Sequence, residues 1–203
     1  FKHLNGDEDN LMAYYQMSDG IGTTLTDNSS NSNDGTLKKM NNNAWVNSYV
    51  PLADLPSAYQ NNVEGLWEST ATAYSDESDG LSLSVDVALS NDFIIFGNND
   101  DDNGTSSSSI LGLELISDRV WYFEEIGDIT ADVKIDISIA TGYSGGATLT
   151  ADNYKLLYKT CAMCDYSDIS DGLSKSVNGT DITFSSVIIK DGYYTIGSTD
   201  SNL

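Results

Sequence analysis

The chain has few basic residues: 9 lysines and arginines stand against 31 aspartates and glutamates in 203 residues, and the formal net charge is −22. Such a charge repels the phosphates of nucleic acids and of anionic lipid headgroups, so we expect neither as a partner. It favours the binding of divalent cations instead. The sequence also lacks any apolar run long enough to cross a bilayer, so we expect no membrane insertion.

Histidine is nearly absent, because His3 is the single one in the chain. It lies at the start of the sequence, so the main part has no Ser-His-Asp or Cys-His set for nucleophilic catalysis. Adjacent carboxylates such as Glu124 and Glu125 are common, but 31 acidic residues make such pairs inevitable. Glycoside hydrolysis by two carboxylates stays open as an alternative. We expect a protein that is not an enzyme.

Cysteine is scarce too, and the two present lie close together in "CAMC" as Cys161 and Cys164. A zinc site needs four ligands, which two cysteines and one distant histidine do not supply. A redox-active Cys-x-x-Cys begins a helix in a βαβ unit, and the surrounding sequence shows no such context. In an exported protein we expect a disulfide that closes a tight loop, and free thiols are the alternative.

Turn residues and alternating hydrophobic residues dominate what is present. Asx-Gly pairs, which tolerate the positive φ of two-residue hairpin turns, recur along the chain. They are Asn5-Gly6, Asp19-Gly20, Asp34-Gly35, Asp79-Gly80, Asn103-Gly104, Asp171-Gly172, Asn178-Gly179 and Asp191-Gly192. Residues 81–89, 133–139 and 154–158 alternate between apolar and polar side chains, as strands with one buried face do. The runs "FIIF" (93–96) and "VWYF" (120–123) are typical of central strands. The chain is therefore predicted to be all-β, built from jelly-roll-like β-sandwich units with little or no helix.

Residues 51–63, "PLADLPSAYQNNV", hold both prolines of the chain and show no alternation. At most one helical turn is expected there. We interpret this segment as a linker between two units, residues 1–50 and residues 64–198, with a short tail at 199–203.

The polar first unit follows an ordered set of motifs: paired aromatics, an acidic-Gly turn, Gly-Thr-Thr-Leu, Asp-x-Ser-x-Asn, Asp-Gly-Thr-Leu and a tryptophan strand. In this sequence they are Tyr14 and Tyr15, Asp19-Gly20, residues 22–25, Asp27 with Ser29 and Asn31, residues 34–37, and Trp45. This order resembles the laminin-G-like (concanavalin-A-like) jelly-roll modules of secreted bacterial proteins. The resemblance implies turns and short strands rather than disorder. The expected strands are 11–17, 23–25, 35–38 and 44–46.

The first unit is too short for a complete sandwich of that kind, because about fifty residues cannot supply two multi-stranded sheets. We therefore expect residues 1–50 to be part of a sandwich that preceding chain or a neighbouring molecule completes.

Several segments of residues 64–198 carry a second resemblance. They are "GLSLSVDVAL", "DFIIFGNND", "DRVWYFEEIGD", "VKIDISI", "NYKLLYKT" and "DGYYTIGS". They resemble a domain that follows such modules in large surface proteins of Bacteroidetes-type bacteria. The resemblance implies an extracellular location on a bacterial cell surface, and no defined biochemical role. Because the sequence begins at Phe1 without a signal peptide, we expect a mature or excised portion of a longer protein.

The loop "GNNDDDNGTSSSS" (97–109) is the candidate metal site. Asn99, Asp101 and Asn103 fall at the first, third and fifth positions of a calcium-loop pattern. The acid expected at the twelfth position is missing, since Ile110 stands there. Calcium is thus the candidate cofactor, and a solvated hairpin loop without metal is the alternative.

The aromatic residues offer a possible surface for sugars. The candidates are Trp67, Trp121, Tyr122, Tyr193 and Tyr194. Adjacent aromatics on a strand, however, favour one ring in the core and its neighbour on the outer face.

The sequence as a whole predicts a structural or adhesive module of a bacterial surface fibre, filament or large adhesin. Its expected partners are other copies of itself or upstream segments of the same protein, and surface glycans stay open. The alternative is a carbohydrate-binding module of a secreted polysaccharide-processing protein.

Overall fold

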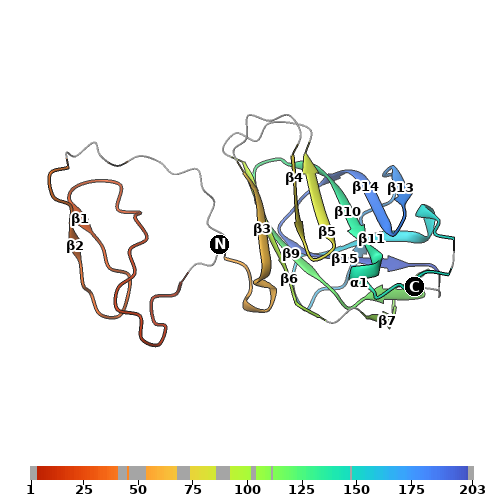
Figure 1. The fold of residues 1–203 in the computed structure, drawn as a ribbon, viewed down its shortest axis with the longest axis horizontal. Helices are drawn as coiled ribbons and strands as arrows, with labels where there is room; N and C mark the ends of the chain where they lie inside the picture. The colour runs from red at the N-terminus through yellow and green to blue at the C-terminus, as the bar shows by residue number, and fades with distance from the viewer. Residues whose placement is uncertain are drawn as a thin grey trace. The chain divides into compact units, whose positions relative to one another are not determined.

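A computed structural model describes residues 4–40, 45, 54–67, 74–85, 92–101, 104–110, 112–146 and 148–200. The chain divides into two compact units (Figure 1). The first unit is Lys2–Leu52, and the second unit contains Ala53–Leu203. The prediction of an all-β chain with a β-sandwich is confirmed, because two antiparallel sheets of the second unit face each other across one core.

One sheet of the second unit has five strands in the order β13-β14-β10-β5-β4. Their bounds are β13 Lys175–Asn178, β14 Asp181–Ile188, β10 Thr130–Asp136, β5 Leu81–Val85 and β4 Tyr74–Ser78. The hairpin β4–β5 turns at Asp79-Gly80, where both residues have positive φ (40° and 87°). A side chain at Gly80 would approach Ile139 to 2.8 Å, so this turn requires glycine.

The other sheet has eight strands, six of which follow the order β12-β11-β15-β9-β6-β3. Their bounds are β12 Ser167–Asp168, β11 Tyr154–Lys159, β15 Gly192–Ser198, β9 Trp121–Ile126, β6 Phe93–Asn98 and β3 Asn61–Trp67. The remaining pair is β7 (Thr105–Ser107) and β8 (Leu115–Ser117), and β8 extends the sheet beside the end of β15.

The core lies between these two sheets and takes alternate residues mainly from the inner strands of each sheet. Its large, fully buried side chains include Leu81, Leu83, Ile135 and Phe184 from the five-stranded sheet and Ile94, Phe96, Trp121, Phe123 and Tyr194 from the eight-stranded sheet. The rings of Phe123 and Tyr194 stack with centroids 4.1 Å apart. Where the structure describes them, the alternating residues mark the buried face as predicted; residues 86–89 of the predicted alternation lie outside the described residues.

The alternation of residues 133–139 predicts a longer strand than the structure contains. β10 ends at Asp136, and residues Ile137–Ala140 form the short helix α1. The Asp136 carboxylate accepts hydrogen bonds from the backbone N–H and hydroxyl of Ser138, which caps the helix. Two 3-10 turns complete the helical content that the structure describes, η1 (Ser57–Tyr59) and η2 (Ala151–Asn153). No helix within the described ranges has the length and apolar character needed to cross a bilayer.

The segment interpreted as a linker, residues 51–63, belongs in part to the sandwich. Leu55 is buried against Ile95 on the outer face of the eight-stranded sheet, and the backbone N–H of Asp54 donates to a carboxylate oxygen of Glu124 at 2.8 Å. β3 already begins at Asn61. The second unit therefore begins at Ala53, inside the segment interpreted as a linker.

The first unit contains little regular structure. Its two strands, β1 (Thr24–Leu25) and β2 (Gly35–Thr36), pair antiparallel over two residues each, and one further bridge joins Tyr15 to Asp27. Of the strands expected here, 23–25 and 35–38 are thus present in shortened form, and 11–17 contributes the bridge at Tyr15. Residues 44 and 46 lie outside the described residues.

Candidate functional site

A buried carboxylate organises the first unit. Asp27 is 6% exposed and accepts four hydrogen bonds, from the backbone N–H groups of Tyr14, Ser29 and Asn33 and from the Ser29 hydroxyl. Its own N–H donates to the Asp34 carboxylate at 3.0 Å. These bonds hold three separate stretches of backbone around one side chain.

The charge state of Asp27 follows from those bonds. Burial by itself raises the pKa of the carboxyl, but the hydrogen bonds from Tyr14, Ser29 and Asn33 outweigh burial and lower the pKa from 3.8 to about 2. Asp27 is therefore ionised at neutral pH, as a carboxylate that accepts several N–H bonds must be. The Asp-x-Ser-x-Asn motif of the sequence thus has a structural role in this unit.

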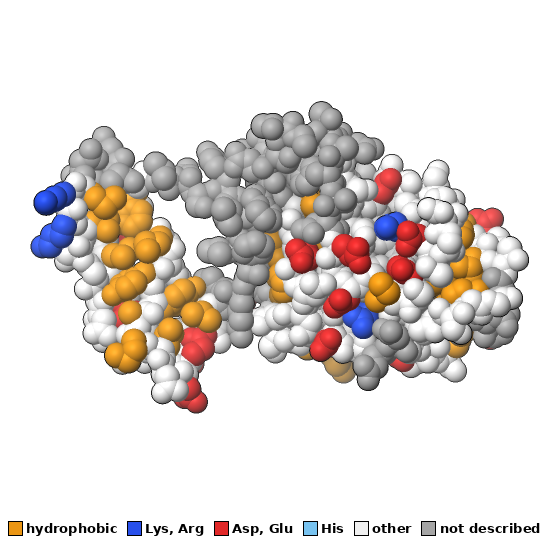
Figure 2. Space-filling model, in the orientation of Figure 1, with side chains coloured by type: hydrophobic (Ala, Val, Ile, Leu, Met, Phe, Trp, Pro, Cys, Tyr) orange, Lys and Arg blue, Asp and Glu red, His pale blue; other side chains and the backbone are white. Residues whose placement is uncertain are grey.

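The apolar side chains of the first unit are exposed or only partly buried. Among its described residues no hydrophobic side chain is buried, whereas Asp27 and Ser29 are. Met12, Met17 and Ile21 are 74%, 61% and 81% exposed. Figure 2 shows hydrophobic side chains gathered on the visible face of this unit. We call Met12, Met17, Ile21 and Met40 the uncovered apolar set.

The Asp-rich loop after β6 holds the candidate calcium ligands, and the structure brings an arginine to it. Arg119 is buried, and its Nη2 donates to the backbone carbonyl of Asp101 at 2.9 Å. Its Nη1 lies 3.6 Å from a carboxylate oxygen of Asp79. The side-chain oxygen of Asn99 accepts the N–H of Val120 at 3.0 Å. These residues therefore tie the loop to the strand beside it.

A calcium ion in this loop stays a prediction. Asn103 lies outside the described residues, and within the parts of the chain that are described no three acidic, histidine or cysteine side chains gather as a metal-binding group. The Arg119 guanidinium is a fixed positive charge beside Asp101, which works against a cation there. If calcium binds, chelation lowers the melting temperature and added calcium restores it. No response to the chelator would contradict the metal site.

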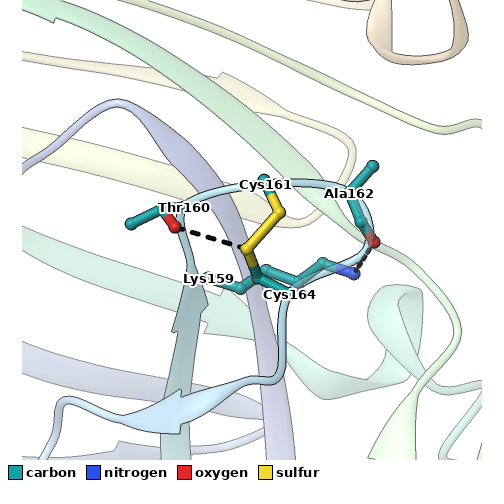
Figure 3. Close-up of a disulfide and its surroundings, with 5 residues drawn as sticks. All are labelled: Lys159, Thr160, Cys161, Ala162 and Cys164. Carbon is teal, nitrogen blue, oxygen red and sulfur yellow. Dashed lines mark hydrogen bonds between the residues drawn. A yellow bond between two sulfur atoms is a disulfide. The ribbon is translucent and has the colours of Figure 1, made fainter.

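The two cysteines are joined in the structure. Cys161 and Cys164 form a disulfide that closes the turn between β11 and β12 (Figure 3). Lys159 Nζ donates to the Ala162 carbonyl inside this turn at 2.9 Å, and the Thr160 hydroxyl lies 3.6 Å from Cys164 Sγ. Met163, at the tip, is 94% exposed. The turn is thus fixed by one covalent bond and by the amine of the preceding strand.

A cluster of tyrosines covers part of the outer face of the eight-stranded sheet. The pairs Trp121-Tyr122 and Tyr193-Tyr194 divide as the sequence predicts, because Trp121 and Tyr194 lie in the core. Tyr122 and Tyr193 face outward, directly opposite each other on β9 and β15, with ring centroids 4.9 Å apart. Tyr59 from η1 packs on Tyr193 at 5.1 Å. The side chain of Trp67 lies outside the described residues.

These tyrosines pack against one another rather than forming a flat platform. The Tyr122–Tyr193 and Tyr59–Tyr193 planes meet at 72° and 73°, so each ring presents its edge to the face of another. Burial raises the pKa of Tyr59 and of Tyr122, so both stay protonated. The arrangement fits the packing of a sheet face better than stacking on a sugar.

A polar hollow of about 430 Å³ lies beside this cluster. Residues 107–110 at the end of β7 and Ile116 of β8 form one wall, and residues 164–166 after the disulfide form the other. No motif of the sequence indicates this hollow, because its walls come from segments about fifty residues apart. Its one local signal is the serine run of residues 106–109.

The chain matches no protein-family model, and comparisons with curated proteins and with solved structures gave no match. The resemblance to laminin-G-like modules therefore stays a prediction that rests on the motif residues alone.

Proposed function

We propose that the chain is a non-enzymatic structural or adhesive module of a bacterial surface fibre, filament or large adhesin. In this proposal the first unit pairs strand-to-strand with another copy of the chain. The observation that carries the proposal is the first unit's lack of any buried hydrophobic side chain among its described residues. An apolar surface of this kind is typical of a unit that another chain completes.

Burial of the uncovered apolar set by a partner supplies free energy for this contact. Fully burying a side chain of this size contributes about 1.5–3 kcal/mol. A partner that covers Met12, Met17 and Ile21 therefore gains a large part of what a specific contact requires. The short strands β1 and β2 add backbone groups that an incoming strand can pair with.

Charge supports a contact through this unit rather than through the sandwich. Residues 2–52 hold 6 acidic and 3 basic side chains, whereas the rest of the chain holds 25 and 6, so the formal charges are −3 and −19. Two sandwiches repel each other strongly, and a contact that involves the first unit meets less repulsion. A contact between two different surfaces that does not close into a ring builds a fibre.

The extracellular location is part of the proposal. The Cys161–Cys164 disulfide supports it, because disulfides persist in oxidising compartments and are rare in the cytosol.

The test compares the full chain with a variant that carries Met12→Ser and Ile21→Ser. Sedimentation velocity over a concentration series and electron microscopy measure assembly. We expect the unaltered chain to form elongated assemblies with rising concentration and the variant to disperse.

The matched control is Ile188→Ser, which removes an exposed isoleucine (66%) from β14 of the sandwich. It should assemble like the unaltered chain. A dispersed monomer at every concentration, or equal loss of assembly in the control, would contradict the proposal. Assembly that needs an added upstream segment would assign the contact to that segment instead of a second copy.

A further inference from the structure

We infer that the polar hollow between residues 107–110, Ile116 and residues 164–166 is a binding site for a short neutral saccharide. Its volume of about 430 Å³ falls within the range of small-molecule sites, about 300–1,000 Å³. All of its walls belong to the second unit. The inference is thus independent of the assembly proposed for the first unit.

One wall supplies hydroxyl groups. Ser107, Ser108 and Ser109 line it, and each hydroxyl is both a donor and an acceptor. The Ser108 hydroxyl oxygen accepts the N–H of Ile110 at 3.0 Å, and its proton stays available for donation. Serine residues at the end of β7 match a ligand that itself carries many hydroxyls.

The other wall supplies a carboxylate and a ring. Asp165 accepts hydrogen bonds from sugar hydroxyls, and the Tyr166 ring offers an apolar surface to the C–H groups of a sugar ring. The aliphatic side chains of Ile110 and Ile116 add to that surface. The lining thus combines polar groups with a smaller apolar surface, which suits a ligand that carries many hydroxyls.

Charge selects against anionic ligands. Asp165 lies in the lining, and the unit that contains it carries a formal charge of −19. Phosphorylated or carboxylated ligands are therefore repelled. A neutral saccharide forms hydrogen bonds with the hydroxyls and is not repelled by this negative charge.

The wall that carries Tyr166 is held in place by its neighbours. Lys159 Nζ lies 4.5 Å from the centroid of the Tyr166 ring, and the same amine donates to the Ala162 carbonyl. The Cys161–Cys164 disulfide closes the turn just before Asp165 and Tyr166. Figure 3 shows Lys159 reaching the carbonyl of this turn. The covalent turn and the amine thus position the carboxylate and the ring before a ligand arrives.

The phenol of Tyr166 keeps its proton. Burial, together with Tyr59 and Tyr193, raises the pKa of Tyr166 well above its usual value. The hydroxyl therefore remains a hydrogen-bond donor across the physiological range.

The experiment screens the full chain on an array of neutral and anionic oligosaccharides and then measures the tightest neutral binder by titration calorimetry. We expect binding to neutral components, down to millimolar affinity, and none to anionic ones. Ser109→Trp fills the hollow and should abolish binding. Tyr166→Phe removes one hydroxyl and should weaken binding by about fivefold to tenfold, the value of one hydrogen bond.

The matched control is Ser176→Trp, which places the same bulk on an exposed position of β13. It should bind like the unaltered chain, and the melting temperatures of all variants should agree. Binding should also be the same in the Met12→Ser and Ile21→Ser variant, whether or not the chain assembles. Absence of binding to every neutral component, or binding that Ser109→Trp leaves unchanged, would overturn the inference.

Discussion

The first unit buries a carboxylate and no described hydrophobic side chain, whereas the second unit buries aromatic and aliphatic side chains between two sheets. In the first unit, backbone N–H groups from Tyr14, Ser29 and Asn33 converge on Asp27. In the second, rings such as Phe123 and Tyr194 stack in the core between the two sheets. Hydrogen bonds thus order a loop-rich unit that buries no described hydrophobic side chain, whereas a unit that folds independently depends on burial of apolar surface.

A core truncation in the second unit should cause the largest loss of stability. Phe123→Ala removes a fully buried ring and should lower the free energy of unfolding by about 3–5 kcal/mol. The matched change in the first unit, Met17→Ala, should change the unfolding of the sandwich by less than about 0.5 kcal/mol. Urea denaturation of the dispersed protein measures both. Equal losses would mean that Met17 belongs to the same cooperative core.

A second prediction concerns the disulfide, which has no counterpart in the first unit. Cys161→Ser with Cys164→Ser opens a very short loop, and the loss of closure entropy corresponds to about 2 kcal/mol. Thermal unfolding should show a modest fall for the sandwich. Intact mass under non-reducing conditions checks the starting state, and two thiols open to alkylation would contradict the disulfide.

The third prediction concerns Asp27, the hydrogen-bonded carboxylate of the first unit. Asp27→Asn keeps the size of the side chain but removes the charge that four donors share. The amides of Tyr14, Ser29 and Asn33 should then exchange with solvent rapidly, while the amides of β9 and β15 stay protected. Asp7→Asn, an exposed position in the same unit, is the control and should leave exchange unchanged. Unchanged protection in Asp27→Asn would show that another group holds this unit.

The stability of the first unit should depend on pH through the buried carboxylate of Asp27. The pKa of Asp27 is lowered from 3.8 to about 2, so the folded unit binds this proton more weakly than the unfolded chain. Its contribution to stability is complete above the ordinary value and is lost as pH falls through the folded one. NMR amide signals of Tyr14 and Asn33 should therefore shift at a pH near 2. A midpoint near the ordinary value would contradict the hydrogen-bonded carboxylate.

Much of the sandwich could be predicted from the sequence, because apolar and polar side chains alternate along its strands with a period of two residues. Trp121 and Tyr122 fall on opposite faces as alternation requires. The same rule fails after Asp136, because the side chain of that residue caps a helix and diverts an alternating segment from the sheet. A local hydrogen bond there outweighs a pattern that extends over seven residues.

The candidate sites were harder to predict, since their residues are distant in sequence. Arg119 reaches the Asp-rich loop from beyond β8, and the sequence of the loop itself does not predict this contact. The hollow joins residues 107–110 to residues 164–166 across the sheet. The cysteine spacing, by contrast, is local, and the disulfide could be predicted from it together with the expected compartment.

Segment-resolved hydrogen exchange at low and high protein concentration tests whether another chain completes the first unit. We expect amides of residues 11–26 to gain protection as concentration rises, while amides of the sandwich core stay equally protected throughout. A second chain that adds a strand must shield those backbone groups from water. Exchange in residues 11–26 that is the same at every concentration would contradict the claim.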